Sequence, residues 1–196
     1  ATEHALAQLA RRGDAVSLIE IDRHDWTSFV AFRDPARVPG LLRVVLSSDR
    51  EEEWAPALAS LETCGSDLGV PCAMTPALVS CLVAIALRTD GKKGAAVVSL
   101  LEELTCGRGA EGYSEQERHW LHEAVRALMP GLSLWEAIVE NGSRDDAVNA
   151  IDLLAYCAEH FPEHRDRVRR VLGSCEQQRP ELAEEGRAVR PYWECP

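Results

Sequence analysis

The chain has 196 residues, of which 46% are hydrophobic but only 6% aromatic, and its formal net charge is -11 at pH 7. This length suits one domain or a short run of stacked repeats, and so acidic a molecule repels nucleic-acid phosphates and anionic lipid surfaces. We therefore expect a single domain over residues 1–196 that binds neither nucleic acid nor a membrane.

The first half of the chain alternates helix starts with breakers. The apolar run 16–21 is too short and too isolated to build a sheet, so we expect helix or irregular structure there. Asp34-Pro35 predicts a helix start, with the helix running to about Ser48. Pro56 is expected to interrupt the helix that follows. That helix carries a short apolar stripe at Trp54, Leu58 and Leu61.

The second half continues the same punctuation. Thr75-Pro76 opens a helical segment that runs to about Arg88. Its residues 78–87 are apolar nearly all round, as in a helix buried inside a stack. Ser114 with Glu117 has capping-box spacing, and Ser143 with Asp146 repeats it. The clearest helical stripe consists of Ala147, Ile151, Leu154, Ala158 and Phe161.

Together these signals predict helical hairpins at about 36–64, 75–105, 114–160 and 162–190, with Pro130 ending or kinking a helix inside the third. Hairpins of this kind need neighbours to cover their apolar faces. The predicted fold class is all-α, an α-solenoid of stacked helical hairpins.

Three ordered stretches carry a family resemblance: IDRHDWTSFVAFRDPARVPGLLRVVLSSD at 21–49, AMTPALVSCLVAIAL at 73–87, and the long helical segment at 121–164. Over about 22–175 the chain resembles uncharacterised bacterial HEAT-like repeat proteins, whose repeat type also occurs in phycobilisome lyases. It departs from them at CGSDLGVPC, residues 64–72, where relatives carry a polar His-Gln-Gly loop. The resemblance implies that the fold is a right-handed α-solenoid of the HEAT-like type with a recognition surface, and it implies no particular activity.

The cysteines are odd in number and lack CxxC spacing, and the chain shows no signal-peptide pattern. We therefore expect reduced thiols and a cytoplasmic location. No run approaches the roughly 18 apolar residues that cross a bilayer. The seven cysteines are Cys64, Cys72, Cys81, Cys106, Cys157, Cys175 and Cys195.

Metal and cofactor motifs are weak. Helical spacing could gather Cys157, His160 and His164 around a metal ion. Pro162, however, is expected to start a new helix and to redirect His164, so we expect no metal site. No phosphate loop, nucleophile elbow or HExxH motif is present in the sequence. We therefore expect no cofactor and no enzyme activity.

The alternative to a binding protein is an enzyme on the same scaffold, similar to HEAT-like DNA glycosylases or chromophore lyases. Such an enzyme would use a concave groove, and Trp120, Trp135 and Glu123 are its candidate lining residues. His119 and His122 are expected on exposed surface. A structural adaptor is a further alternative that the sequence does not separate from an inhibitor.

Acidic residues gather at turns and helix starts, where the helix dipole favours carboxylates. Their number predicts a patch for a cationic protein, provided that the stacked hairpins bring several of them to one rim. We expect a protein-binding module, an inhibitor or immunity-type protein that neutralises a toxin or another basic partner. The candidate partner-binding residues are Asp49, Glu51, Glu52, Glu53, Asp67, Glu115, Glu117 and Glu123.

Overall fold

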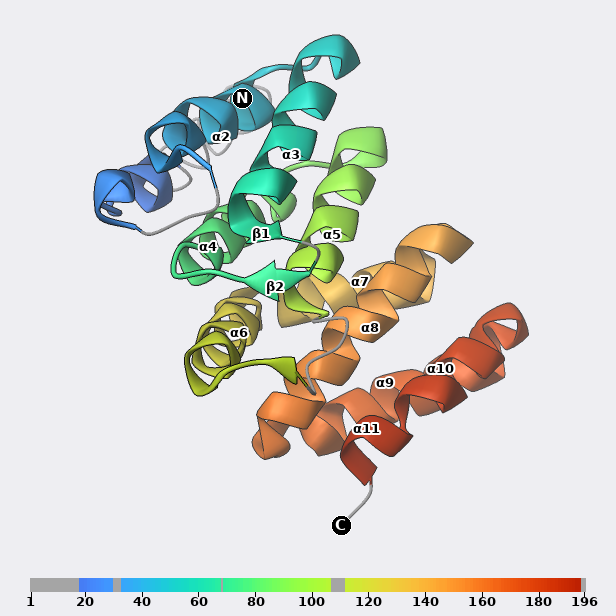
Figure 1. Ribbon diagram of the computed structural model, residues 1–196. Coiled ribbons are helices and arrows are strands. Elements are labelled where there is room, and N and C mark those ends of the chain that lie inside the picture. Colours follow the sequence, from blue (N-terminus) through green and yellow to red (C-terminus); the bar gives the residue numbers. More distant parts are fainter. Residues whose placement is uncertain (1–17, 30–32, 68, 107–111, 195–196) are drawn as a thin grey trace.

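The computed structural model describes residues 18–29, 33–67, 69–106 and 112–194, and helices dominate this part of the chain (Figure 1). The prediction of an all-α protein is confirmed. The α-helices are α2 (Val38–Ser47), α3 (Glu51–Gly65), α4 (Thr75–Ala86), α5 (Gly91–Thr105), α6 (Glu115–Ala127), α7 (Leu132–Asn141), α8 (Arg144–His160), α9 (Arg165–Gln178), α10 (Ala183–Val189) and α11 (Pro191–Glu194).

Short elements join these helices. Residues 18–22 are helical, in line with the expectation for the run 16–21 as far as it is described. The 3-10 helices are η1 (Trp26–Ser28), η2 (Pro35–Arg37), η4 (Met129–Gly131), η5 (Pro162–His164) and η6 (Pro180–Leu182). Strand structure in the described residues is confined to β1 (Ser66–Asp67) and β2 (Val70–Pro71), which pair antiparallel.

The helices pack as pairs in two layers (Figure 1). Neighbours along the chain contact one another in the pairs α2 with α3, α4 with α5, α7 with α8, and α9 with α10. Between pairs, α3 contacts α5, α5 contacts α8 and α8 contacts α10, while on the other side α4 contacts α6 and α7 contacts α9. The predicted segment 114–160 therefore contains three helices, because η4 divides its first half at Pro130.

The predicted helix starts follow local capping chemistry. The Ser114 hydroxyl accepts a hydrogen bond from the Glu117 backbone amide at 3.2 Å, and the Glu117 carboxylate accepts one from the Ser114 amide at 2.7 Å. Ser143 accepts from the amide of Asp146 at 3.2 Å. These bonds satisfy amide groups that the first helical turn leaves free.

One expected interruption is absent. The α3 helix continues through Pro56, although proline lacks the amide that bonds four residues back. Pro56 is the sixth residue of the helix and is exposed, so a single backbone carbonyl near the helix start loses its partner and can bond water instead. The helix extends to Gly65, where an added Cβ would lie 2.6 Å from Leu78 and 2.8 Å from Leu104. The helices pack closely at this point because Gly65 has no side chain.

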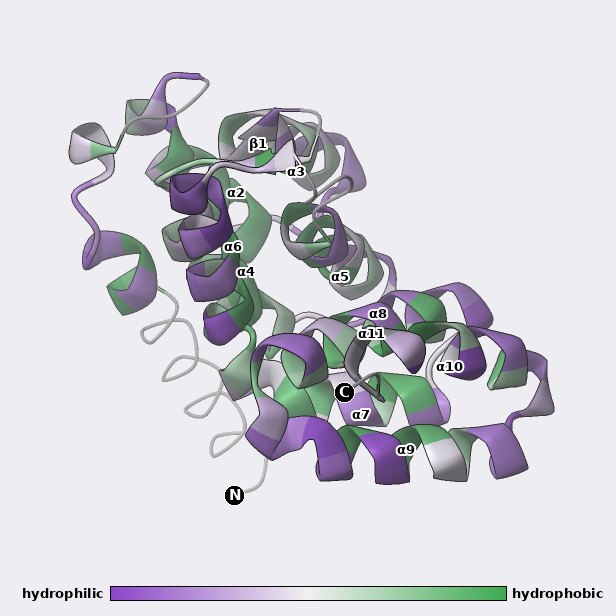
Figure 2. Ribbon diagram, turned by 60° about the horizontal axis from the view of Figure 1, so that its bottom comes forward, coloured by the Kyte–Doolittle hydropathy of each residue, from purple (hydrophilic) through white to green (hydrophobic). Residues whose placement is uncertain are grey.

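The core runs along the interface between the two layers. Ile151, Leu154 and Ala158 are fully buried, as the helical stripe predicted, while Phe161 is only half-buried. Figure 2 shows α4 as largely hydrophobic and α6 and α9 as hydrophilic on one side. No helix within the described ranges is long and apolar enough to cross a membrane.

Candidate functional site

A cavity of about 250 Å³ opens between α5, α8 and α10, and we call it the acidic pocket. Apolar side chains from α8 and α10 form part of its wall, and three carboxylates project into the remainder. The residues that matter for its chemistry are Glu102, Cys106, Asp152, Tyr156, Glu159 and Val189.

The packing of α8 explains why a carboxylate lies in this pocket. Ile151 and Leu153 are fully buried and fix the rotation of the helix, so the intervening Asp152 is held at the interface with α5. Burial raises the pKa of Asp152 to about 6, and the negative charge of Glu102 adds to the effect. Burial also raises the pKa of Glu159, which Arg165 partly offsets.

The described part of the chain supplies a counter-charge to only one of the three pocket carboxylates, because Arg165 lies near Glu159. Among residues within the described ranges, no lysine or arginine forms an ion pair with Glu102 or Asp152. The Tyr156 hydroxyl donates to the backbone carbonyl of Cys106 at 3.1 Å, which fixes the ring at the pocket wall. Two nearby carboxylates between apolar walls, with no ion pair to a described lysine or arginine, attract a positively charged group.

Sequence reasoning missed this pocket. Glu102 and Asp152 are 50 positions apart in the chain, and only the packing of α5 on α8 brings them together. One signal was available, because Asp152 is the lone charged residue in the apolar run 150–155. A carboxylate in a buried helical stripe indicates either a paired charge or a functional group.

The predicted acidic cluster at the start of α3 is largely neutralised within the chain. Lys93 lies 3.7 Å from Asp49 and Lys92 lies 3.4 Å from Glu51, which ties this turn to the start of α5. Arg50 forms ion pairs with Glu52 at 2.8 Å and with Glu53 at 2.9 Å. These pairs reduce the field that the cluster offers to a partner. The cluster consists of Asp49, Glu51, Glu52 and Glu53.

The other predicted turn residues lie elsewhere. Asp67 is exposed in β1, just beyond the last turn of α3, and Glu115 is exposed at the start of α6. The Tyr113 hydroxyl donates to the Gly69 carbonyl at 2.5 Å, which places the start of α6 beside the β1–β2 turn. The helix α3 is about 22 Å long at 1.5 Å per residue, so these carboxylates and the cluster at its start lie at opposite ends. The expectation of one shared rim is therefore wrong.

Glu117 also has a local role, because its carboxylate completes the capping box of α6. Glu123, further along the same helix, forms an ion pair with Arg126 at 2.9 Å. Neither side chain lies in the acidic pocket. They remain candidates for partner contact only as parts of the α6 surface.

The aromatic groove of the enzyme alternative does not form from the residues expected to line it. Trp135 is fully buried, and its indole nitrogen donates to the Leu128 carbonyl at 3.3 Å. The ring therefore belongs to the core, where it packs over Gly131. Trp120 is half-buried on α6. The expectation that Trp135 lines a groove is wrong, because the kink at η4 turns that side chain inward.

One histidine, His122, lies differently from expectation. Its Nδ1 is 3.3 Å from Nδ1 of His160, and the neighbouring Cys157 is fully buried. His122 is thus half-buried, which corrects its expected exposure, whereas His119 is exposed. Burial, together with the charge of His122, lowers the pKa of His160 to about 4.

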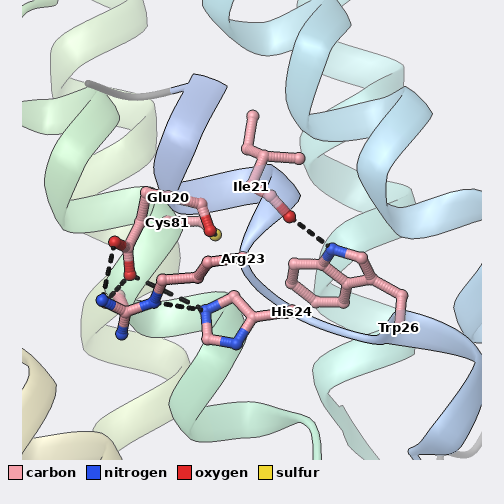
Figure 3. Close-up of polar contacts among 7 residues, drawn as sticks. Glu20, Ile21, Arg23, His24, Trp26 and Cys81 are labelled. Carbon is pink, nitrogen blue, oxygen red and sulfur yellow. Dashed lines mark hydrogen bonds and ion pairs between the residues drawn. The ribbon is translucent and has the colours of Figure 1, made fainter. Parts of the chain in front are cut away.

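One group of residues in the described ranges could hold a metal ion. Glu20, His24 and Cys81 each offer a ligand atom, and these atoms all lie within 4.8 Å of one another (Figure 3). Glu20 and His24 belong to the N-terminal segment, defined here as residues 18–29, and Cys81 belongs to α4. The sequence alone did not single out this group.

In comparisons with known proteins, no family model, no curated protein and no solved structure matches the chain. The resemblance to HEAT-like repeat proteins therefore stays a prediction.

Proposed function

We propose that this chain is a protein-binding module that holds a basic side chain of its partner in the acidic pocket. The observation that carries the proposal is the pair of carboxylates, Glu102 and Asp152, in a cavity where neither forms an ion pair with a described lysine or arginine. A lysine or arginine from a partner would bring the missing charge. Ion pairs that are shielded from water at the centre of an interface contribute far more than those at its rim.

The pocket has the dimensions and chemistry for one long cationic side chain. Ala155, Ala188 and Val189 provide apolar wall for the methylene stem of a lysine or arginine. The carboxylates of Glu102, Asp152 and Glu159 provide acceptors for its charged end. The net charge of -11 would also steer a basic protein toward the molecule.

The fold and cellular role complete the proposal. We propose that the two helical layers form a right-handed HEAT-like solenoid, supported by the contacts of successive helix pairs. We propose an inhibitor or immunity-type role, in which the chain covers the basic surface of a toxin or another basic protein. The six described cysteines are free thiols, in line with the cytoplasmic location expected from the sequence.

The test is a pull-down from the native host, or with the products of adjacent genes co-expressed. Wild-type chain should retain a basic protein that the double variant Glu102→Gln, Asp152→Asn loses. The matched control is Asp145→Asn, because Asp145 is an exposed carboxylate in the first turn of the same helix as Asp152. Retention of the same partner by the double variant, or capture of acidic proteins alone, would refute the proposal.

An enzyme on the same scaffold is the second candidate, and the raised pKa of Asp152 favours it, because a carboxyl group near pKa 6 can act as a general acid. No lysine or arginine of the described residues lines the acidic pocket, which disfavours the glycosylase-like form that must bind DNA phosphates. An enzyme would lose turnover in Asp152→Asn while keeping its affinity for substrate. The binding module would lose affinity instead.

A further inference from the structure

We propose that Glu20, His24 and Cys81 form a zinc-binding site that fastens the N-terminal segment to α4. Glu20 and His24 are four residues apart in the sequence, and the Glu20 carboxylate lies 3.7 Å from Nε2 of His24. Cys81 approaches from α4, with its sulfur 3.6 Å from the backbone carbonyl of Glu20 (Figure 3). One carboxylate, one imidazole and one thiol thus converge from two segments of the chain.

The spacing suits a small tetrahedral ion. Zinc binds nitrogen and oxygen at about 2.0–2.2 Å and sulfur at about 2.3 Å, so its ligand atoms lie about 3.4–3.7 Å apart. The three ligand atoms here lie within 4.8 Å of one another, so a shift of about 1 Å closes the site. A set of sulfur, nitrogen and oxygen ligands favours Zn²⁺ over Mg²⁺ or Ca²⁺, which prefer oxygen alone.

The imidazole presents the right atom to the cluster. Nε2 of His24 lies 3.7 Å from the Glu20 carboxylate and accepts a hydrogen bond from Nε of Arg23 at 3.3 Å, so an incoming metal ion takes the place of Arg23 at that nitrogen. As the acceptor of the Arg23 hydrogen bond, Nε2 carries no proton. A neutral imidazole is the form that binds metal ions.

The thiol must lose its proton to bind. In the free chain the Cys81 thiol donates a hydrogen bond to the Glu20 carbonyl, so the sulfur carries its proton there. Zinc binding converts it to a thiolate, forms the Zn–S bond and releases one proton to solvent. The Ser80 hydroxyl donates a hydrogen bond to the Glu20 carboxylate and so holds that ligand in place.

Arg23 is the competitor of the metal ion. Its guanidinium lies 3.0 Å from the Glu20 carboxylate, and its side chain is 57% exposed. It can therefore swing into solvent when a divalent cation enters. The N-terminal segment stays in place independently of Arg23, because Ile21 and Trp26 are buried in the hydrophobic core. Within the segment, the indole nitrogen of Trp26 donates to the Ile21 carbonyl at 2.7 Å.

The experiment titrates Zn²⁺ into the purified full chain by calorimetry and repeats the titration with Co²⁺ in an absorption spectrometer. We expect one tight site per chain and a thiolate-to-cobalt charge-transfer band. His24→Ala should weaken zinc binding at least about 100-fold, since even the loss of a residue that only hydrogen-bonds to a metal ligand lowers the affinity about 10–100-fold. Cys81→Ser should abolish the band. His119→Ala and Cys175→Ser are the controls for a histidine and a cysteine outside the cluster, and both should bind as wild type.

The variant Arg23→Ala protects the test against misfolding, because it alters only an exposed side chain. Removal of a positive charge near the ion should tighten zinc binding about ten-fold. The proposal is overturned if the wild-type chain binds no stoichiometric zinc, if His24→Ala and Cys81→Ser bind it as tightly as wild type, or if Arg23→Ala leaves the affinity unchanged.

Discussion

The substitution Asp152→Asn should stabilise the protein at pH 7, although it removes a charged residue next to the core. Burial and Glu102 raise the pKa of Asp152 from 3.8 to about 6 in the folded chain. The folded state therefore binds its proton more tightly than the unfolded state does. Between about pH 4 and pH 6 the free energy of unfolding falls as pH rises, and above pH 6 the full cost of the buried charge is present.

The magnitude follows from the size of the shift. A shift of about two pKa units corresponds to about 3 kcal/mol, and because the side chain is only partly buried we discount this to about 1–2 kcal/mol. Asparagine has nearly the same shape and no charge. In a chain of this size the gain would raise the melting temperature by about 2–8 °C at pH 7, and it should disappear below about pH 4.

The assay is urea unfolding of wild type, Asp152→Asn and Asp145→Asn between pH 4 and pH 8. The comparison with wild type is essential, because His160 changes stability in the opposite direction. The pKa of His160 is lowered to about 4, so protonation of the unfolded chain reduces stability as pH falls from about 6.5 to 4. That contribution is common to all three proteins and cancels. A variant that is less stable than wild type at pH 7, or a difference that does not change with pH, would refute the reasoning.

Three other predictions concern the fold and the surface. Leu154→Ala should cost about 2–5 kcal/mol in urea unfolding, because Leu154 is fully buried; an unchanged melting temperature would contradict its place in the core. Gly65→Ala should destabilise the chain, because the new Cβ would lie 2.6 Å from Leu78, whereas Gly40→Ala at an open position is the control. Replacing all three glutamates at 51–53 with lysine should slow association with the basic partner only modestly, since Arg50, Lys92 and Lys93 already neutralise that cluster. A loss of binding as large as that of the double variant Glu102→Gln, Asp152→Asn would place the interface at this turn.

The parts of the fold that depend on local chemistry could be predicted from the sequence. Caps such as Ser114 and Ser143 act within four residues, so their spacing is visible in the chain. The buried stripe of α8 is also visible in the sequence, because its apolar residues recur every three or four positions, as on one face of a helix. The predicted helix interruption at Pro56 was wrong, because the effect of a proline depends on where the helix starts and on which side of it faces solvent. Neither is a local property of the sequence.

The candidate sites depend on packing between distant segments and could not be read in this way. Glu102 faces Asp152 because α5 packs on α8, and Cys81 lies near Glu20 because α4 packs beside the N-terminal segment. The acidic turns are easy to see in the sequence, because exposed turns carry several charged residues in a row. The same exposure lets nearby cations form ion pairs with these carboxylates. An isolated carboxylate in an apolar run, as at Asp152, was the more informative signal.

The most direct test of the acidic pocket is the pKa of Asp152 in the free chain and in the complex with its basic partner, measured by carboxyl ¹³C NMR during a pH titration. The free chain should show a pKa of about 6. A lysine or arginine held between Glu102 and Asp152 favours the ionised carboxylate, so the pKa in the complex should fall to about 4 or below. A pKa that stays near 6 in the complex would show that the partner binds elsewhere.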